Sequence, residues 1–88
     1  MQKVLIVDDD RDFAEMAKLV LGNSNYLVTM VSEIKSAFKM ISRNHYDMIV
    51  SNYSLPHCSE VITAARIHNP HCRYVLLNET GMIISRAS

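Results

Sequence analysis

The fold is decided by residues 3–10, KVLIVDDD, in which a continuous apolar run ends in three aspartates. An apolar run without alternation is typical of a strand that is buried on both faces, as in a parallel sheet. A second such run, MIVS at residues 48–51, ends in Asn52. Because ligands bind at the carboxyl ends of neighbouring parallel strands, the carboxylates and the amide are expected to converge at one functional edge.

Strand and helix patterns alternate along the rest of the chain. Alternation at this spacing predicts right-handed crossovers and a parallel sheet that is covered by helices on both faces. No linker or repeat interrupts the pattern, so residues 1–88 are expected to form a single domain. The expected strands are residues 3–7, 26–31, 47–51 and 73–77, and the expected helices are about residues 11–21, 33–44 and 59–67.

The helices carry start signals and apolar stripes. Asp10 and Ser32 precede the first two helices and are the expected N-caps. The side chains expected to face the sheet repeat at helical spacing, and they are Ile34, Ala37, Phe38 and Ile41 in the second helix and Val61, Ala64, Ala65 and His68 in the third.

The C-terminal segment allows more than one interpretation. The turn-rich quartet at residues 78–81 separates residues 74–77 from the apolar residues 82–84. We expect an antiparallel hairpin here, with Gly81 in its loop. The start of another helix and a disordered end remain alternatives.

Composition narrows the class of partner. Nine basic residues balance nine acidic ones, so no overall field favours nucleic acid or an anionic membrane. No apolar run reaches the roughly 20 residues of a membrane-spanning helix, and the chain enters a strand pattern without a leader. Two cysteines are too few for a disulfide framework. We therefore expect a cytoplasmic protein with protein partners, without nucleic acid or membrane.

Two segments, residues 4–10 and 46–56, resemble the receiver domain of bacterial response regulators. The resemblance implies a flavodoxin-like α/β fold, here shortened after the fourth strand, and a role in two-component phosphorelay signalling. It places the Mg²⁺-binding acid pair at Asp8 and Asp9 and the phosphoacceptor at Asn52. It places the Thr or Ser that contacts the phosphoryl group at Asn78, whereas the lysine, the fourth helix and the final helix of the family have no counterpart.

These departures argue against phosphotransfer. An acyl phosphate requires a carboxylate nucleophile, and the amide of Asn52 is neither basic nor anionic enough to serve. The developing charge would also lack the lysine and the hydroxyl that stabilise it. We expect a non-enzymatic, non-phosphorylatable module with no cofactor or with weakly bound Mg²⁺. The alternative is a weakly active or engineered phosphoacceptor fragment in which Asn replaces Asp at position 52.

Two further sets of residues could form a zinc site and a protein interface. His57 and Cys58 are expected at the opposite end of a helix from His71 and Cys72, which argues against one zinc site. Without the missing helices, the fourth strand and the hairpin should expose apolar surface to a second copy or to a signalling protein. The interface residues expected on this basis are Tyr74, Leu76, Met82, Ile83 and Ile84.

Overall fold

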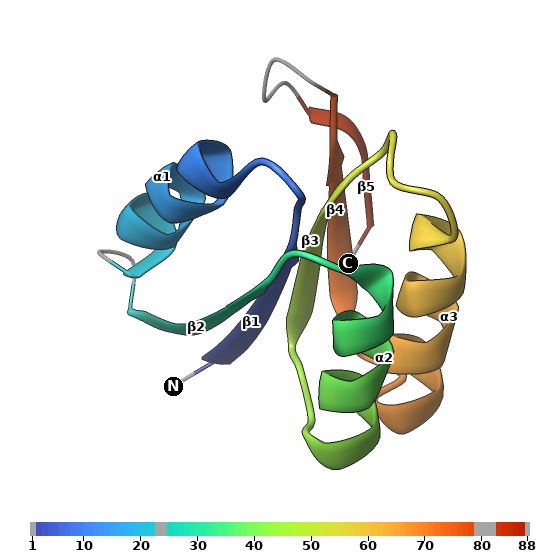
Figure 1. Cartoon of the computed structure of the whole chain (residues 1–88). Coiled ribbons are helices and arrows are strands. Elements are labelled where there is room, and N and C mark those ends of the chain that lie inside the picture. The colour runs from blue at the N-terminus through green and yellow to red at the C-terminus, as the bar shows by residue number, and fades with distance from the viewer. Residues whose placement is uncertain (1, 23–24, 79–82, 88) are drawn as a thin grey trace.

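The computed structural model describes residues 2–22, 25–78 and 83–87 and forms one twisted sheet between two helical layers (Figure 1). The sheet order is β2-β1-β3-β4-β5, in which β1 to β4 are parallel and β5 is antiparallel to β4. The elements are β1 (Gln2–Val7), α1 (Arg11–Gly22), β2 (Tyr26–Val31), α2 (Ile34–Arg43), β3 (Met48–Asn52), α3 (Cys58–His68), β4 (Arg73–Leu77) and β5 (Ile83–Ala87).

The expected flavodoxin-like α/β fold is confirmed. α1 lies on one side of the sheet, and α2 and α3 lie together on the other (Figure 1). The strands β1 to β4 and the helices α1 to α3 are present as expected, with ends within one or two residues. β3 is displaced by one residue, so that Asn52 is the last residue of the strand rather than the residue after it.

Burial on both faces explains the unbroken apolar runs. In β1, Leu5 and Val7 pack with the layer of α2 and α3, whereas Val4 and Ile6 pack with Ala14 of α1. Successive side chains of a strand point to opposite faces, so a run that is buried on both faces shows no alternation between apolar and polar residues. The two sets of buried side chains from α2 and α3 are Ala37, Ile41, Cys58, Val61, Ile62 and Ala65.

The antiparallel pairing expected at the C-terminal end is confirmed, although β5 runs from Ile83 to Ala87 and Gly81, the expected loop residue, lies outside the described residues. β5 pairs with β4 in antiparallel register, with Leu76 opposite Ser85 and Leu77 opposite Ile83. The register shifts between these two pairs, which leaves Ile84 as an extra residue in β5. Met82, which we expected in this strand, lies outside the described residues.

Three local expectations are wrong. The residue at the N-cap of α2 is Glu33, not Ser32, and its side chain makes no capping hydrogen bond. Phe38 is exposed, because the side chains that reach the sheet from α2 are those of Ala37 and Ile41. His68 is exposed as well, because it is the last residue of α3 and lies where the helix runs past the amino edge of the sheet.

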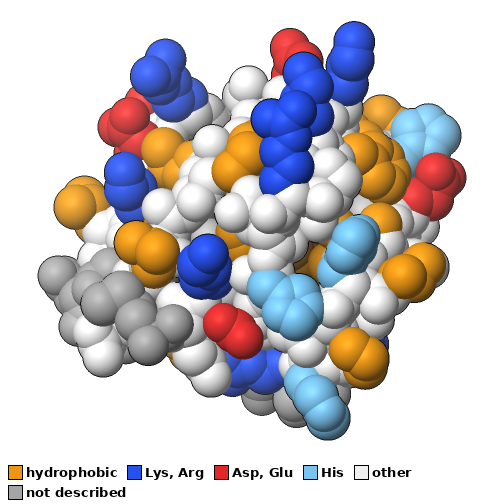
Figure 2. Space-filling view, turned by 90° about the horizontal axis from the view of Figure 1, so that it is seen from below, with side chains coloured by type: hydrophobic (Ala, Val, Ile, Leu, Met, Phe, Trp, Pro, Cys, Tyr) orange, Lys and Arg blue, Asp and Glu red, His pale blue; other side chains and the backbone are white. Residues whose placement is uncertain are grey.

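Loops at the amino edge are held together by polar contacts. A ring nitrogen of His45 contacts the carbonyl oxygen of His68, and the Asn69 side-chain amide donates to the Tyr46 carbonyl at 3.0 Å. Histidine side chains gather on one part of the surface seen from this end (Figure 2). Within the described residues, however, no three His, Cys, Asp or Glu side chains come together as a metal site.

Candidate functional site

The candidate site lies at the carboxyl edge of the sheet, where β1, β3 and β4 end. Asp8 follows β1 directly, Asn52 ends β3, and Asn78 follows β4. The register sets Val7 beside Ser51 and Asn52 beside Leu77, so the three strand ends are level. The topology therefore brings Asp8 and Asn52 together as the sequence predicts.

Asp8 is a buried carboxyl group, with only 3% of its surface exposed. Its Oδ1 accepts a hydrogen bond from the backbone N–H of Asp10 at 2.9 Å. Burial raises the pKa of Asp8, the two hydrogen bonds from Asp10 and Asn52 oppose that shift, and the charges of Asp9 and Asp10 add to it. Asp8 is thus an acid whose charge is only partly compensated.

Asn52 bridges Asp8 and the turn that follows β3. Its Nδ2 donates to Asp8 Oδ1 at 3.5 Å, a long contact. Its Oδ1 accepts from the Ser54 backbone N–H at 2.9 Å and from Ser54 Oγ at 2.7 Å. Two donors on the oxygen determine which end of the amide faces Asp8, because rotating the amide would set N–H groups against each other.

Sequence reasoning missed Ser54. The side chain of an Asn often accepts a hydrogen bond from the backbone N–H two residues later, in an Asx turn. The position of Asn52 directly before a turn could therefore have predicted its contact with Ser54. The Asn52 carbonyl also accepts from the Leu55 N–H at 3.1 Å, and the Tyr53 N–H donates to the Leu77 carbonyl at 2.8 Å. The turn after Asn52 is therefore held by hydrogen bonds to both the backbone and the side chain of Asn52.

A hollow of about 420 Å³ lies beside the acids. Asp8 and the exposed Asp9 line one part of it, and Arg11, at the start of α1, lines another. Arg11 is paired with Glu15 on the surface at 3.7 Å. The hollow combines two carboxylates and one guanidinium with a partly apolar lining of Ala14, Met30 and Val31.

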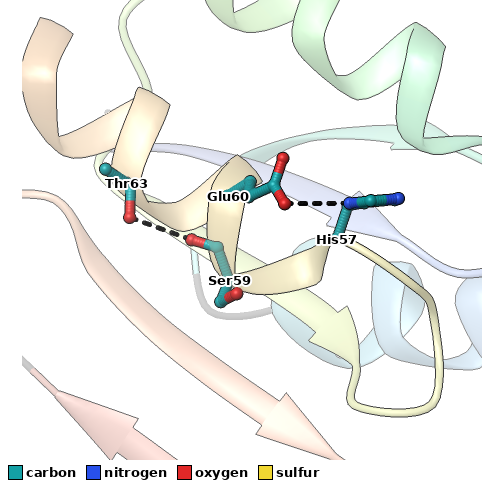
Figure 3. A network of polar contacts seen from close by, with 4 residues as sticks. All are labelled: His57, Ser59, Glu60 and Thr63. Atoms are coloured by element: carbon teal, nitrogen blue, oxygen red, sulfur yellow. Dashed lines mark hydrogen bonds and ion pairs between the residues drawn. The ribbon is translucent and has the colours of Figure 1, made fainter.

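The turn from β3 into α3 contains a strained residue. His57 precedes α3 with a φ of 66°, in the left-handed region that glycine adopts at least cost. Its Nδ1 lies 2.9 Å from Glu60 Oε1, and Thr63 Oγ1 donates to the Ser59 carbonyl at 3.0 Å (Figure 3). These contacts, rather than a side-chain cap, hold the first turns of α3.

The expected interface residues are not equally accessible. Leu76 is 8% exposed and packs in the core beneath α2 and α3, which corrects our expectation that it faces a partner. The reason is that these two helices already cover its face of β4. Tyr74 is half-buried, with the Arg66 guanidinium 6.0 Å from its ring centre, whereas Ile83 is 54% exposed. Ile84 lies in β5 and Met82 outside the described residues.

The fold and this edge define a class of protein. The model of the response regulator receiver domain family matches residues 4–85. The chain belongs to this family. Receiver domains are signalling modules of two-component systems that interact with other proteins, such as kinases and effector domains, and are generally not enzymes.

Individual relatives support the family assignment. Regulatory protein VanR of Enterococcus faecium is 32% identical over 79 residues, which cover 90% of this chain and 34% of VanR. The chain thus spans about a third of the length of this relative.

In the described residues, none of the helices is both long and apolar enough to cross a membrane.

Solved structures share the fold. A Burkholderia pseudomallei response regulator, solved with a phosphorylated aspartic acid, calcium ion and citrate, has a TM-score of 0.77 at 20% identity, over 89% of this chain and 47% of that one. Response regulator TrrA of Thermotoga maritima, in complex with Mg²⁺ and BeF, has a TM-score of 0.74 at 24% identity, over 89% and 70%. At these identities the likeness establishes the fold alone.

Proposed function

We propose that this chain is a receiver-like module that does not accept a phosphoryl group and that signals through protein contacts. The observation that carries the proposal is the state of Asn52, whose oxygen receives two hydrogen bonds from Ser54 and whose nitrogen donates to Asp8. In this arrangement the amide occupies the phosphoacceptor position as a structural bridge. Asp8 is held by a neutral donor instead of being prepared for chemistry.

The chemistry of the amide supports the proposal. Attack on a phosphoryl group requires an electron-rich oxygen, and an amide oxygen that already accepts two hydrogen bonds is a poor nucleophile. Asn78 stands where the family has a Thr or Ser, so a hydroxyl that would stabilise charge is replaced by an amide. Each change lowers reactivity independently of the other.

Mg²⁺ binding is expected to be weak. Asp8 and Asp9 supply two carboxylates at the edge, and Mg²⁺ in proteins often rests on one or two carboxylates with water completing its octahedron. One oxygen of Asp8 already receives N–H groups from Asp10 and Asn52. A cation at this site would therefore compete with internal donors, and its role would be charge compensation.

The proposed partners are proteins. Among the expected interface residues whose burial the structure describes, Ile83 is exposed and Tyr74 is half-buried. A second copy is the simplest partner for the unpaired edge strand β5. The balance of basic and acidic residues disfavours nucleic acid. A cytoplasmic location accords with these partners and with the family.

Intact-mass measurement after incubation with Mg²⁺ and acetyl phosphate tests the proposal. We expect no added phosphate on the wild-type chain and slow, partial labelling of Asn52→Asp, because that variant regains the nucleophile but not the other groups. The Burkholderia pseudomallei regulator, which has been solved with a phosphorylated aspartate, checks the reaction conditions. A stable phosphorylated wild-type species at Asp8, Asp9 or Asp47 would contradict the proposal.

A further inference from the structure

An unprotected edge strand lies on the side of the molecule opposite the hairpin. β2 is at the end of the sheet order, and within the part of the chain that the structure describes it pairs with β1 alone. Its sequence, YLVTMV, contains no charged residue and no proline. Edge strands of proteins usually carry such residues to prevent pairing with another chain. Their absence from β2 indicates that this edge is covered in the functional assembly.

A groove beside β2 extends the apolar surface. It has a volume of about 610 Å³ and lies between α1 and β2. Leu19 of α1 and Leu27 of β2 line it and are 70% and 52% exposed, and Tyr26 and Val28 contribute to its floor. Tyr26 and Val28 lie on the α1 face of β2, as Leu19 does, whereas the side chain of Leu27 lies on the opposite face, so this edge exposes apolar surface on both faces of the sheet.

The charges at this groove are self-complementary. Glu15 and Lys18 both line it and lie three residues apart on α1, so they are neighbours on the helix surface. Both are exposed. Glu15 also pairs with Arg11 at 3.7 Å on the surface of its own helix, whereas among the described residues Lys18 takes part in no ion pair. A patch that carries one acid and one base beside an apolar centre matches an identical patch rotated by 180°.

We propose that the groove between α1 and β2 binds the same groove of a second copy, with β2 antiparallel to its symmetry mate. A twofold axis perpendicular to the sheet makes the two edge strands antiparallel and keeps both α1 helices on the same side. The mate then covers Leu19 of each copy on the α1 face of the joined sheet and Leu27 on the opposite face. Glu15 of each copy faces Lys18 of its mate.

This contact is independent of the phosphoacceptor position and of the hairpin edge. β2 and β5 are the two opposite edges of the sheet, so a contact at one leaves the other free. It would therefore hold even if the chain accepted phosphate. It would also hold if Ile83 faced solvent in every assembly.

Charge reversal tests the contact without disturbing the core. Lys18→Glu and Glu15→Lys each replace two symmetric attractions with repulsions and should weaken self-association, measured by analytical ultracentrifugation, about tenfold. The double variant exchanges the charges and should restore association to near the wild-type level. Circular dichroism checks that each variant is folded.

Two more variants make the result specific. Lys39→Glu, on the exposed face of α2, should leave the association unchanged, and Leu27→Lys should abolish the contact. If Leu27→Lys fails to fold, the charge-reversal variants at Glu15 and Lys18 still test the contact. The proposal is overturned if the wild type is monomeric at about 100 μM, if single reversals change nothing, or if the double variant remains as weak as the singles.

Discussion

At the scale of single residues, the site is organised by one amide. Asn52 donates to Asp8 and accepts from Ser54, so it satisfies groups on β1 and on the turn after β3 at the same time. A carboxylate at position 52 could accept from Ser54 but would repel Asp8. The preference for an amide is therefore electrostatic as well as chemical.

The buried acid leads to a prediction about pH. Because burial raises the pKa of Asp8 above its ordinary value of 3.8, the folded protein binds this proton more tightly than the unfolded chain does. Its contribution to stability is then fully present below pH 3.8 and decreases as the pH rises through the folded pKa. Asp8→Asn keeps an oxygen that can accept the same hydrogen bonds. Because an amide does not titrate, this variant does not lose stability as the pH rises through the folded pKa of Asp8.

Asp8→Asn should thus be more stable than the wild type at neutral pH, and the difference should vanish in acid. Urea unfolding followed across pH 3 to 8 measures it, with Asp12→Asn on the exposed first turn of α1 as the matched control. A lower free energy of unfolding for Asp8→Asn at neutral pH would mean that the charge of Asp8 is needed for the fold.

At the scale of elements, the start of α3 stores strain. A left-handed conformation costs a residue other than glycine about 1–2 kcal/mol, and glycine loses about 0.5–1 kcal/mol more backbone entropy on folding. His57→Gly should therefore raise the free energy of unfolding by roughly 0.5 kcal/mol. Chemical denaturation of His57→Gly and of His57→Ala, which keeps the strain, separates relief of strain from loss of the His57–Glu60 contact. Destabilisation of both variants by the same amount would contradict this account.

Much of this arrangement could be predicted from the sequence, for identifiable reasons. The strands that end at Val7 and Asn52 contain the unbroken apolar runs of residues 4–7 and 48–50, so their burial and their level ends follow from topology. The direction of a side chain within a short turn does not follow from spacing, which is why the contact of Ser54 with Asn52 was missed. Leu76 was expected on the surface because a helix was missing, but its side chain points to the face that α2 and α3 cover.

At the scale of the whole molecule, the antiparallel strand β5 ends the sheet beside β4. Ile83 lies opposite Leu77, whose side chain is buried in the layer beneath α1, so the apolar layer continues to the edge of the sheet. In neighbouring antiparallel strands, directly opposite side chains lie on the same face. The exposed Ile83 thus extends this layer to the surface.

Ile83→Lys should therefore lower the average mass of the protein in sedimentation experiments at about 100 μM, because a charge disfavours pairing at an edge strand. Any association that remains in this variant measures the contribution of the α1–β2 groove. Lys39→Glu, which alters the exposed face of α2, should sediment like the wild type. An unchanged mass for Ile83→Lys would remove the hairpin edge from the interface.

The most direct test of the central claim is the effect of Mg²⁺ on the stability of the wild type and of Asn52→Asp. We expect the Asn52 amide to compensate the charge of Asp8, as a bound cation would. Excess Mg²⁺ should then leave the free energy of unfolding of the wild type almost unchanged. Without Mg²⁺, Asn52→Asp should be less stable by about 1–3 kcal/mol, the range for a buried group that loses its partner, and Mg²⁺ should restore most of that loss. Equal stabilisation of both proteins by Mg²⁺, or an Asn52→Asp variant as stable as the wild type without it, would contradict the account.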